Sequence, residues 1–577
     1  MSKLFDMFLK NRGYTEDFLK TIETSFKTDL YDIENLVDKL YYIKKSGKKL
    51  VVLPDFDMDG IMSGTLGFAG FAELGFNVEL FIPDPNKGYS FNKEVIDDLV
   101  KAHPGVDAII TCDNGINSFE GVQYAKDLGL YVFITDHHKP SDTYPNADVI
   151  VDPLRFEDEY KLKGICGAHV LWQVLMKYAE KYENKQIIEQ IDRLQVFAGI
   201  GTVSDMMPML FENRELVRNA ISICRLVLGI DKEQSYFVEH LNGCTPYRSA
   251  FNGLYEILRL FVDMDKIKKL EDLNEEFFGF YLAPMFNSVK RLGGNMDIAF
   301  KTFFSDRQQD YALVLYQMNE NRKILLDKYM IELANQDNPY VPYIYISNAP
   351  LGFLGLIASK LTNETGLPSF VLHKDGLMYS GSGRSPEWFK ANTILNAEGF
   401  DIAGHEGAFG CSFDDISEVK RLYEYLEKNI DEILESLPKN VKLTYDYVID
   451  NGNKYGLSID IGDFEDFIEA YNKLRPFGKD FTAPKGLLVI RGLDNYSVSF
   501  MGGRKQHAKI ILDQGFEVLL WNQADLINSI DSNDLFIEGN LGLSDFMGKT
   551  TVNFMGNITQ IDENNLEEIN YEEYQGY

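Results

Sequence analysis

The chain has 577 residues, of which 45% are apolar and 25% are charged, as in ordinary globular proteins and unlike disordered or collagen-like chains. Its 88 acidic residues outnumber its 57 basic residues and give a formal net charge of −31, so the chain as a whole is not an obvious nucleic-acid binder. Its five cysteines contain no Cys-x-x-Cys pair, and no apolar run reaches about 18 residues. We therefore expect no disulfide framework, zinc site, signal peptide or membrane span, and a cytoplasmic location.

The first 45 residues have the apolar spacing of helices, and an alternating pattern follows them. The predicted strands are short apolar runs at 48–53, 77–82, 107–111, 130–134 and 147–151. Helix-compatible segments lie between several of these runs, at 61–75, 91–102 and 118–128. Strands that alternate with helices indicate crossover connections and a mostly parallel sheet.

Three further regions follow. Residues 165–335 have few strand signals and are predicted to be helical. A second α/β pattern has strands at 343–346, 369–372 and 377–379 and helices at 353–364 and 416–436. From about residue 441, short strands separated by Gly, Asn and Asp predict a small β-barrel or sandwich, and the acidic residues after 561 predict a solvated tail.

Acidic and histidine residues follow the predicted strands of the first sheet. Asp55, Asp57 and Asp59 follow the first strand, Asp113 the third, and Asp136-His137-His138 the fourth, while a Gly-Thr-Val-Ser-Asp segment ends at Asp205. The carboxyl edge of a parallel sheet is where such folds bind ligands, and Asp with neutral His suits Mn²⁺ or Mg²⁺. An EF-hand loop is a rival for the first cluster, but Leu66 stands where its bidentate Glu belongs.

These four motifs, in this order, resemble the DHH phosphoesterase superfamily. Within it the chain is most similar to the RecJ branch of single-strand-specific 5′→3′ exonucleases. Later segments that match the branch are Glu212-Asn-Arg214, Pro284 to Asn287 with Arg291, Ser380 to Ser385, Ala403 to Gly407 and Leu474 to Gly478. The similarity extends from about residue 45 to 555.

The resemblance implies an α/β protein in which a mostly parallel DHH domain and a second α/β domain are joined by helices, followed by a barrel of the oligonucleotide-binding (OB) type. The expected divisions are an N-terminal helical segment (1–45), the DHH domain (46–225), a helical connector (226–335), the DHH-associated substrate-binding domain (336–438), the OB-type domain (439–560) and the acidic tail (561–577).

The resemblance also implies roles for the motif residues. The expected metal ligands for two Mn²⁺ or Mg²⁺ ions are Asp57, Asp59, Asp113, His137 and Asp205. Asp55 and Asp136 would orient ligands or a water, and His138 would face the phosphate. Leu53 stands where many superfamily members have a histidine ligand.

A 5′-exonuclease must also hold the end of its strand. Ser382 and Arg384 match residues that bind the terminal 5′-phosphate in the family, and the alternative is a Gly-rich turn with an exposed Arg. Arg291 and His405 are expected to line the strand path. The family usually has an Arg after the second strand, where this chain offers only Lys87.

Residues 473–509 contain eight basic and two acidic residues within this acidic chain. Phe477, Tyr496 and Phe500 lie among them. Basic residues with interleaved aromatic residues on a small barrel suit a single strand, although the aromatics could instead be core. The expected nucleic-acid groove comprises Lys473, Arg475, Arg504, Lys505 and Lys509.

The sequence thus predicts a monomeric, metal-dependent 5′→3′ exonuclease that degrades single-stranded DNA to mononucleotides in repair or recombination. A single-strand-binding protein or a helicase is a possible protein partner. The alternatives are a phosphodiesterase for oligoribonucleotides or cyclic dinucleotides and a non-catalytic replication scaffold related to RecJ. The C-terminal barrel argues against the first, and the four retained acidic motifs argue against the second.

Overall fold

The computed structural model describes residues 2–25, 28–84, 91–229, 245–436, 445–452, 454–503, 505–528, 533–546 and 549–559. The chain forms two compact units. One contains Met1–Thr24, Met209–Phe211 and Pro438–Tyr577, and the other contains Ser25–Pro208 and Glu212–Leu437. The predicted acidic tail lies outside the described residues. In the part of the chain that is described, no helix has both the length and the hydropathy that crossing a membrane requires.

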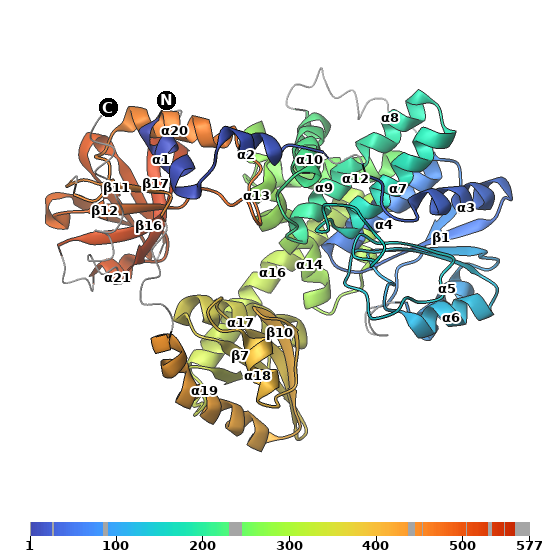
Figure 1. The fold of residues 1–577 in the computed structure, drawn as a ribbon. Helices are drawn as coiled ribbons and strands as arrows, with labels where there is room; N and C mark the ends of the chain where they lie inside the picture. Colours follow the sequence, from blue (N-terminus) through green and yellow to red (C-terminus); the bar gives the residue numbers. More distant parts are fainter. Residues whose placement is uncertain are drawn as a thin grey trace. The chain divides into compact units, whose positions relative to one another are not determined.

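The first sheet of the larger unit is entirely parallel, as the alternating pattern predicted. Its strands are β1 (Lys49–Pro54), β2 (Asn77–Leu80), β3 (Ala108–Cys112), β4 (Tyr131–Thr135) and β5 (Val149–Val151), in the order β2-β1-β3-β4-β5. The helices around it are α3 (Ile33–Lys45), α4 (Met58–Glu73), α5 (Lys93–Ala102) and α6 (Phe119–Asp127). Alternate strand residues point to opposite faces, so Val51 and Leu53 pack with α5 and α6 while Val52 faces α4. Figure 1 shows α5 and α6 together on one side of this sheet.

The described residues of the segment 165–335 are mostly helical, as predicted. The helices are α7 (Gly167–Tyr182), α8 (Lys185–Arg193), α9 (Gln195–Ser204), α10 (Glu212–Leu228), α12 (Pro246–Asp263), η2 (Leu270–Asp272), α13 (Glu275–Phe277), η3 (Phe278–Leu282), α14 (Ala283–Arg291), α15 (Asp297–Phe304) and α16 (Gln308–Ala334). Helix α4 packs against α7, α9 and α12 and is buried around most of its circumference. Its small residues permit this, since a Cβ at Gly70 would meet Leu175 at 2.5 Å.

The second sheet of this unit is mixed, in the order β6-β7-β8-β10-β9. Its elements are β6 (Ile344–Ile346), α17 (Leu351–Thr365), β7 (Ser369–Asp375), β8 (Met378–Arg384), α18 (Ala391–Ala397), β9 (Ile402–His405), β10 (Ala408–Phe413) and α19 (Ile416–Ser436). Phe370 and Leu372 pack in a cluster with α18 and α19, whereas Val371 packs with α17 on the opposite face. The strands β9 and β10 and the helix α18 were not anticipated from the sequence.

The smaller unit contains the predicted C-terminal β-rich region. Its elements are α1 (Lys3–Arg12), α2 (Glu16–Thr21), β11 (Tyr447–Asp450), α20 (Ile461–Asn472), β12 (Gly486–Ile490), η4 (Leu493–Asn495), β13 (Ser497–Met501), β14 (His507–Ile511), η5 (Asp513–Gly515), β15 (Glu517–Leu520), α21 (Ala524–Asn528), β16 (Leu535–Phe546) and β17 (Lys549–Thr559). The strands form one sheet in the order β11-β12-β16-β17-β15-β14-β13. Among the described residues its two edge strands do not pair with each other, so the sheet is not a closed barrel there.

The N-terminal helical segment is divided between the units. Helix α1 packs beside α20, and its Leu4, Met7 and Phe8 are buried in the core of the smaller unit (Figure 1). The Arg12 guanidinium forms an ion pair with Asp446, in which Nη2 donates to Oδ2 at 2.7 Å. Helix α3, in contrast, belongs to the larger unit and packs against α7 and β5.

Candidate active site

The carboxyl ends of three neighbouring strands hold the acidic residues together. Asp55 follows β1, Asp113 follows β3 and Asp136 follows β4. The backbone amide of each extends the hydrogen bonding between neighbouring strands by one residue. Asp55 N donates to Cys112 O, Asp113 N to Thr135 O and Asp136 N to Val151 O. The three carboxylates therefore start from equivalent positions along one sheet edge.

Two further carboxylates come from the start of helix α4, whose first residue is Met58. The Asp57 side chain caps the helix by accepting a hydrogen bond from Gly60 N at 3.0 Å. Asp59, in the first turn, accepts hydrogen bonds from Gly167 N at 2.6 Å and Ala168 N at 3.3 Å, at the start of α7. Gly201 leaves room for Asp59, since a Cβ there would lie 2.3 Å from its Oδ1. The close approach of Asp59 thus explains why the first residue of the Gly-Thr-Val-Ser-Asp motif is glycine.

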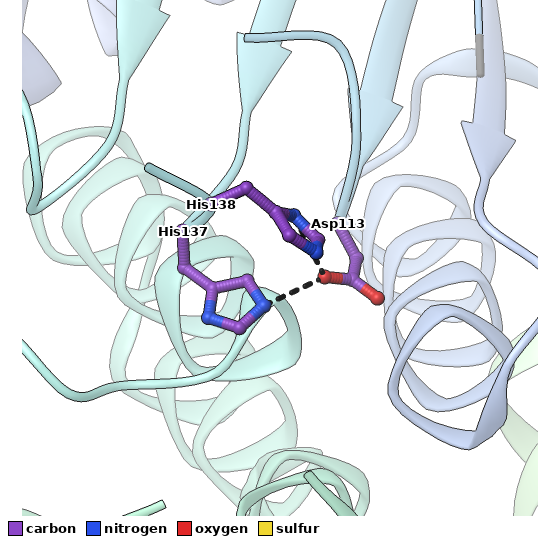
Figure 2. Close-up of side chains that lie close together, drawn as sticks. All are labelled: Asp113, His137 and His138. Carbon is purple, nitrogen blue, oxygen red and sulfur yellow. Dashed lines mark ion pairs between the residues drawn. The ribbon is translucent and has the colours of Figure 1, made fainter. Parts of the chain in front are cut away.

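The two histidines reach the same carboxylates from the loop after β4. The His137 Nε2 atom lies 3.0 Å from Asp113 Oδ1, 3.6 Å from Asp205 Oδ2 and 3.9 Å from Asp59 Oδ2. Figure 2 shows the imidazoles of His137 and His138 on one side of the Asp113 carboxylate. The His138 Nδ1 atom lies 4.0 Å from Asp113 Oδ1 and 2.7 Å from Asp136 Oδ1.

The donor atoms fall into three groups that could hold a metal ion. The groups are Asp113, His137 and His138; Asp59, His137 and Asp205; and Asp55, Asp57 and Asp113. Asp113 is shared by two of them. Its Oδ1 is buried and accepts no hydrogen bond from the described residues. Its nearest polar neighbour is His137 Nε2, at 3.0 Å. A buried carboxylate among other carboxylates is costly, and a bound cation would reduce this cost, so the site fits divalent metal.

The buried carboxylates also perturb one another. Burial, followed by repulsion from Asp59, Asp57, Asp55 and Asp136, holds the pKa of Asp113 well above its usual range. Burial raises the pKa of Asp59 to about 7, against the favourable charge of His137, and burial with the charge of Asp57 raises that of Asp55 to about 6. These groups resist carrying full negative charge together without cations.

Asp136 and His138 form a distinct pair beside this cluster. Burial acts to raise the pKa of Asp136, but the hydrogen bond and charge of His138 prevail and lower it. The same hydrogen bond raises the pKa of His138 to about 9 against its partial burial. Burial lowers the pKa of His137, against the charge of Asp59. The pair thus presents a protonated His138, whereas a neutral His137 suits metal ligation.

We expect the melting temperature of the metal-free protein to fall by at least about 3 °C between about pH 6.5 and 9. Through this window the folded state retains the proton of His138, whose pKa is about 9, after the unfolded state has released it, and up to about pH 7 it also retains the proton of Asp59. Stability therefore decreases as pH rises, and the raised pKa of Asp113 acts in the same direction. Thermal unfolding in EDTA would measure the decrease, and Mn²⁺ should abolish most of it. A metal-free melting temperature that rises through this window would contradict the prediction.

Asp152 is a residue of this sheet edge that was not predicted from the sequence. It follows β5 directly and is completely buried. One carboxylate oxygen accepts a hydrogen bond from Leu154 N at 2.7 Å, while the other accepts none from the described residues. Burial, followed by the charge of Asp136, raises its pKa to about 7. Its place after the predicted strand 147–151 was the signal that could have identified it.

A second cluster in the same unit consists of three arginines. Burial lowers the pKa of Arg291 to about 10, helped by the positive charges of Arg322 and Arg384. The Arg384 guanidinium and the Ser382 hydroxyl lie together over α17, since a Cβ at Gly355 would be 3.0 Å from Arg384 Nη2 and 3.7 Å from Ser382 Oγ. Three half-buried cations that repel one another form an attractive site for an anion. Arg322 was missed, and nothing in its local sequence pointed to it.

Helix α14 links the two clusters at its C-terminal end. The Lys290 ammonium lies 4.3 Å from the centre of the Phe56 ring, and its charge acts on Asp55. The next residue, Arg291, faces the other arginines. Leu53, by contrast, packs in the core of the first sheet and supplies no metal ligand.

The remaining predicted strand-binding residues are distributed differently. Arg384 and His405 both pair with Ala408, from the two sides of β10, so they lie in one row across the second sheet. The Gly-Ser-Gly-Arg segment belongs to β8 and is not the Gly-rich turn that remained as its alternative. Lys87 lies outside the described residues.

Several of the basic residues expected to bind nucleic acid in the smaller unit already interact with other side chains. Lys473 pairs with Glu469 at 2.8 Å, Lys509 pairs with Glu517, and Lys505 is exposed. Arg475 lies 5.7 Å from the ring of Phe477, which is buried and therefore core. Among the residues of this unit whose exposure is described, the most exposed aromatic ring is one that was not predicted, Trp521, which is 51% exposed and lies beside His507. Arg504 lies outside the described residues.

Comparison with known proteins gives two family matches. Residues 49–200 match the DHH family N-terminal domain, and residues 457–557 match the RecJ OB domain. The single-stranded-DNA-specific exonuclease RecJ of Salmonella typhimurium is 27% identical over 67% of this chain and 67% of its own length. The RecJ of Bacillus subtilis is 27% identical over 75% of this chain, and that of Haemophilus influenzae 26% over 66%. The aligned part spans 53% of the first and 65% of the second of these two.

The structures of Thermus thermophilus RecJ in complex with Mn²⁺ and with Mg²⁺ have the same fold. The first superimposes with a TM-score of 0.71 at 20% identity and covers 97% of this chain and 76% of that one. The second superimposes with a TM-score of 0.66 at 19% identity. These matches confirm the predicted α/β architecture and its C-terminal OB domain. The chain thus joins a region that matches the DHH family N-terminal domain to one that matches the RecJ OB domain, the combination to which its similarity to RecJ exonucleases extends.

Proposed function

We propose that this protein is a metal-dependent exonuclease that degrades single-stranded DNA from its 5′ end to mononucleotides. The observation that carries the proposal is the pairing of two clusters in one unit. The buried Asp113 lies among carboxylates and His137, and three arginines gather around Arg291, which follows Lys290 at the C-terminal end of α14. The names of the RecJ relatives support the substrate and the reaction.

The proposed metal ligands are those expected from the sequence: Asp57, Asp59, Asp113, His137 and Asp205. When bound, Mn²⁺ or Mg²⁺ would lower the pKa of a water molecule and neutralise charge on the scissile phosphate. Asp55 would orient the carboxylates of Asp57 and Asp113, which are themselves proposed ligands. Asp136 holds His138 protonated, so His138 would donate a hydrogen bond to a phosphate oxygen. Lys290 would contact the strand between the two clusters.

The arginine cluster would determine the polarity of the reaction. A terminal 5′-phosphate carries about two negative charges, whereas a phosphodiester carries one, so three cations favour the strand end. Arg291, Arg384 and Ser382 were expected here, and Arg322 joins them. His405 would contact the strand beside Arg384.

The OB domain would hold the rest of the strand. Its exposed Lys505 and Trp521 supply backbone attraction and a surface for base stacking, together with Lys473, Arg475, Lys509 and Arg504. We also propose that a single-strand-binding protein or a helicase delivers the strand, because a chain with a net charge of −31 attracts DNA poorly. Repair or recombination in the cytoplasm is the process that this activity would serve.

The test is a polarity assay on a single strand of about 30 nucleotides with a 5′-phosphate and a 3′ label. We expect a ladder that shortens from the 5′ end, requires Mn²⁺ or Mg²⁺ and is weak on a duplex or an RNA. Cleavage of a dinucleotide with the long strand intact would favour a small-substrate phosphodiesterase. Absence of cleavage in either metal would favour a scaffold.

A further inference from the structure

Helix α17 covers the face of the second sheet at β7 and β8 and leaves its β10 and β9 side open, next to the arginine cluster. Phe409, Cys411 and Ile402 are buried against α18 and α19, so the alternate residues of these strands point the other way. On this open face the strand pairing sets Ser382 opposite Gly410, and Gly410 opposite Ala403. The next row contains Ser380 opposite Ser412.

These residues line a cavity of about 340 Å³, which we call the β8–β10 cavity. Leu351 and Leu354 of α17 form its apolar side. Ser380, Ser382, Ser412 and Asp401 supply three hydroxyls and one carboxylate. The cavity is therefore apolar along one side and polar at its edge.

Gly410 keeps this cavity open, and packing does not require a glycine there. A Cβ at Gly410 would meet nothing closer than 3.8 Å. Gly381 and Gly383 differ from Gly410 in this respect. A Cβ at Gly381 would lie 2.0 Å from Val371 O, and a Cβ at Gly383 would lie 2.0 Å from the Phe409 ring. A glycine inside a strand reduces stability, so its presence at 410 without a steric cause suggests a role in the cavity itself.

The position of the cavity indicates its ligand. Ser382 lines it and also lies beside Arg384, one of the three arginines proposed to bind the terminal phosphate. A group attached to that phosphate would extend into the cavity. A nucleobase has flat apolar faces and a polar edge, and a carboxylate on that edge accepts from an amino group, which adenine, cytosine and guanine carry and thymine lacks.

We propose that the β8–β10 cavity binds the base of the 5′-terminal nucleotide and that Asp401 accepts a hydrogen bond from its exocyclic amino group. The inference rests on the proposed exonuclease function and adds to it a subsite for the base that is about to be released. It makes the enzyme sensitive to the first base of the strand, with cytosine preferred over thymine.

The test compares 5′-phosphorylated strands that begin with cytosine, with thymine or with an abasic residue. The full-length protein should have a kcat/KM about tenfold lower on the abasic strand than on the cytosine strand. Gly410→Val fills the cavity and should cleave both strands at the low abasic rate. Asp401→Asn should lose the preference for cytosine over thymine, and Asp414→Asn, an exposed carboxylate just beyond β10, should keep it.

Equal rates on the three strands with the unmodified protein would overturn the inference and leave the exonuclease function intact. Loss of cleavage of every strand would instead contradict the proposed function. If no strand is cleaved, the inference can still be tested by binding. The fluorescence anisotropy of the labelled strands in EDTA measures their affinity for the protein without cleavage. We expect about tenfold weaker binding of the abasic strand, and Gly410→Val should remove the difference; equal affinities would overturn the inference.

Discussion

Replacing Asp113 with Asn is expected to abolish cleavage and, in the same protein, to raise the stability of the metal-free fold. Activity should fall by at least about 1,000-fold, because Asp113 belongs to two of the three groups that could hold metal. Stability in EDTA at pH 8 should rise by about 2–4 °C, because the change removes a carboxyl group whose ionisation is opposed by burial and by four neighbouring carboxylates. Asparagine suits this position, since residue 113 has a φ of 66° and Asn tolerates the left-handed region.

The measurement combines a cleavage assay in Mn²⁺ with thermal unfolding in EDTA and in Mn²⁺. Mn²⁺ should stabilise the unmodified protein more than Asp113→Asn, because it binds only the folded state. Asp142→Asn, an exposed carboxylate of the same domain, should change neither activity nor stability. Lower stability of Asp113→Asn in EDTA would mean that the contact between Asp113 and His137 stabilises the fold by more than the burial of the carboxyl group costs.

The acidic site could be predicted because its geometry follows from strand order alone. In a parallel sheet, residues that follow neighbouring strands share one edge, so the sequence pattern is enough to place Asp55, Asp113 and Asp136 together. Asp152 obeys the same rule and was still missed. It precedes a proline, a setting typical of an ordinary turn, and no histidine or second carboxylate marks it.

The arginine cluster was only half predictable, because it depends on packing between distant segments. Arg291 and Arg384 lie in motifs, whereas Arg322 lies within the 27-residue helix α16 and has no distinctive neighbours. The glycines beside Ser382 were also ambiguous in the sequence. Gly381 and Gly383 resemble a turn in the sequence, but in the sheet they leave room for the Val371 carbonyl and the Phe409 ring.

Replacing Arg322 with Gln is expected to reduce kcat/KM on a 5′-phosphorylated strand by about 10- to 100-fold, with a much smaller effect on a strand ending in a 5′-hydroxyl. A charged hydrogen bond to phosphate contributes about 1.5–3 kcal/mol, which sets this range. Most of the loss should appear in KM, because the terminal phosphate is not the group that reacts. Arg384→Gln should act in the same way, and Arg322→Lys should recover part of the loss.

Steady-state kinetics on the two strand types would measure this selectivity, with Arg307→Gln, an exposed arginine paired with Asp310, as the control. Equal losses on both strands would show that Arg322 attracts the DNA backbone in general. Whether Arg322 selects the terminal phosphate or attracts the DNA backbone in general decides how the 5′→3′ direction of digestion arises. The carboxylate cluster can act on any phosphodiester, so the direction of digestion depends on which phosphate is held one nucleotide away. If three mutually repelling arginines select the doubly charged terminal phosphate, removing one of them should weaken the enzyme's choice of strand end before it weakens the chemistry.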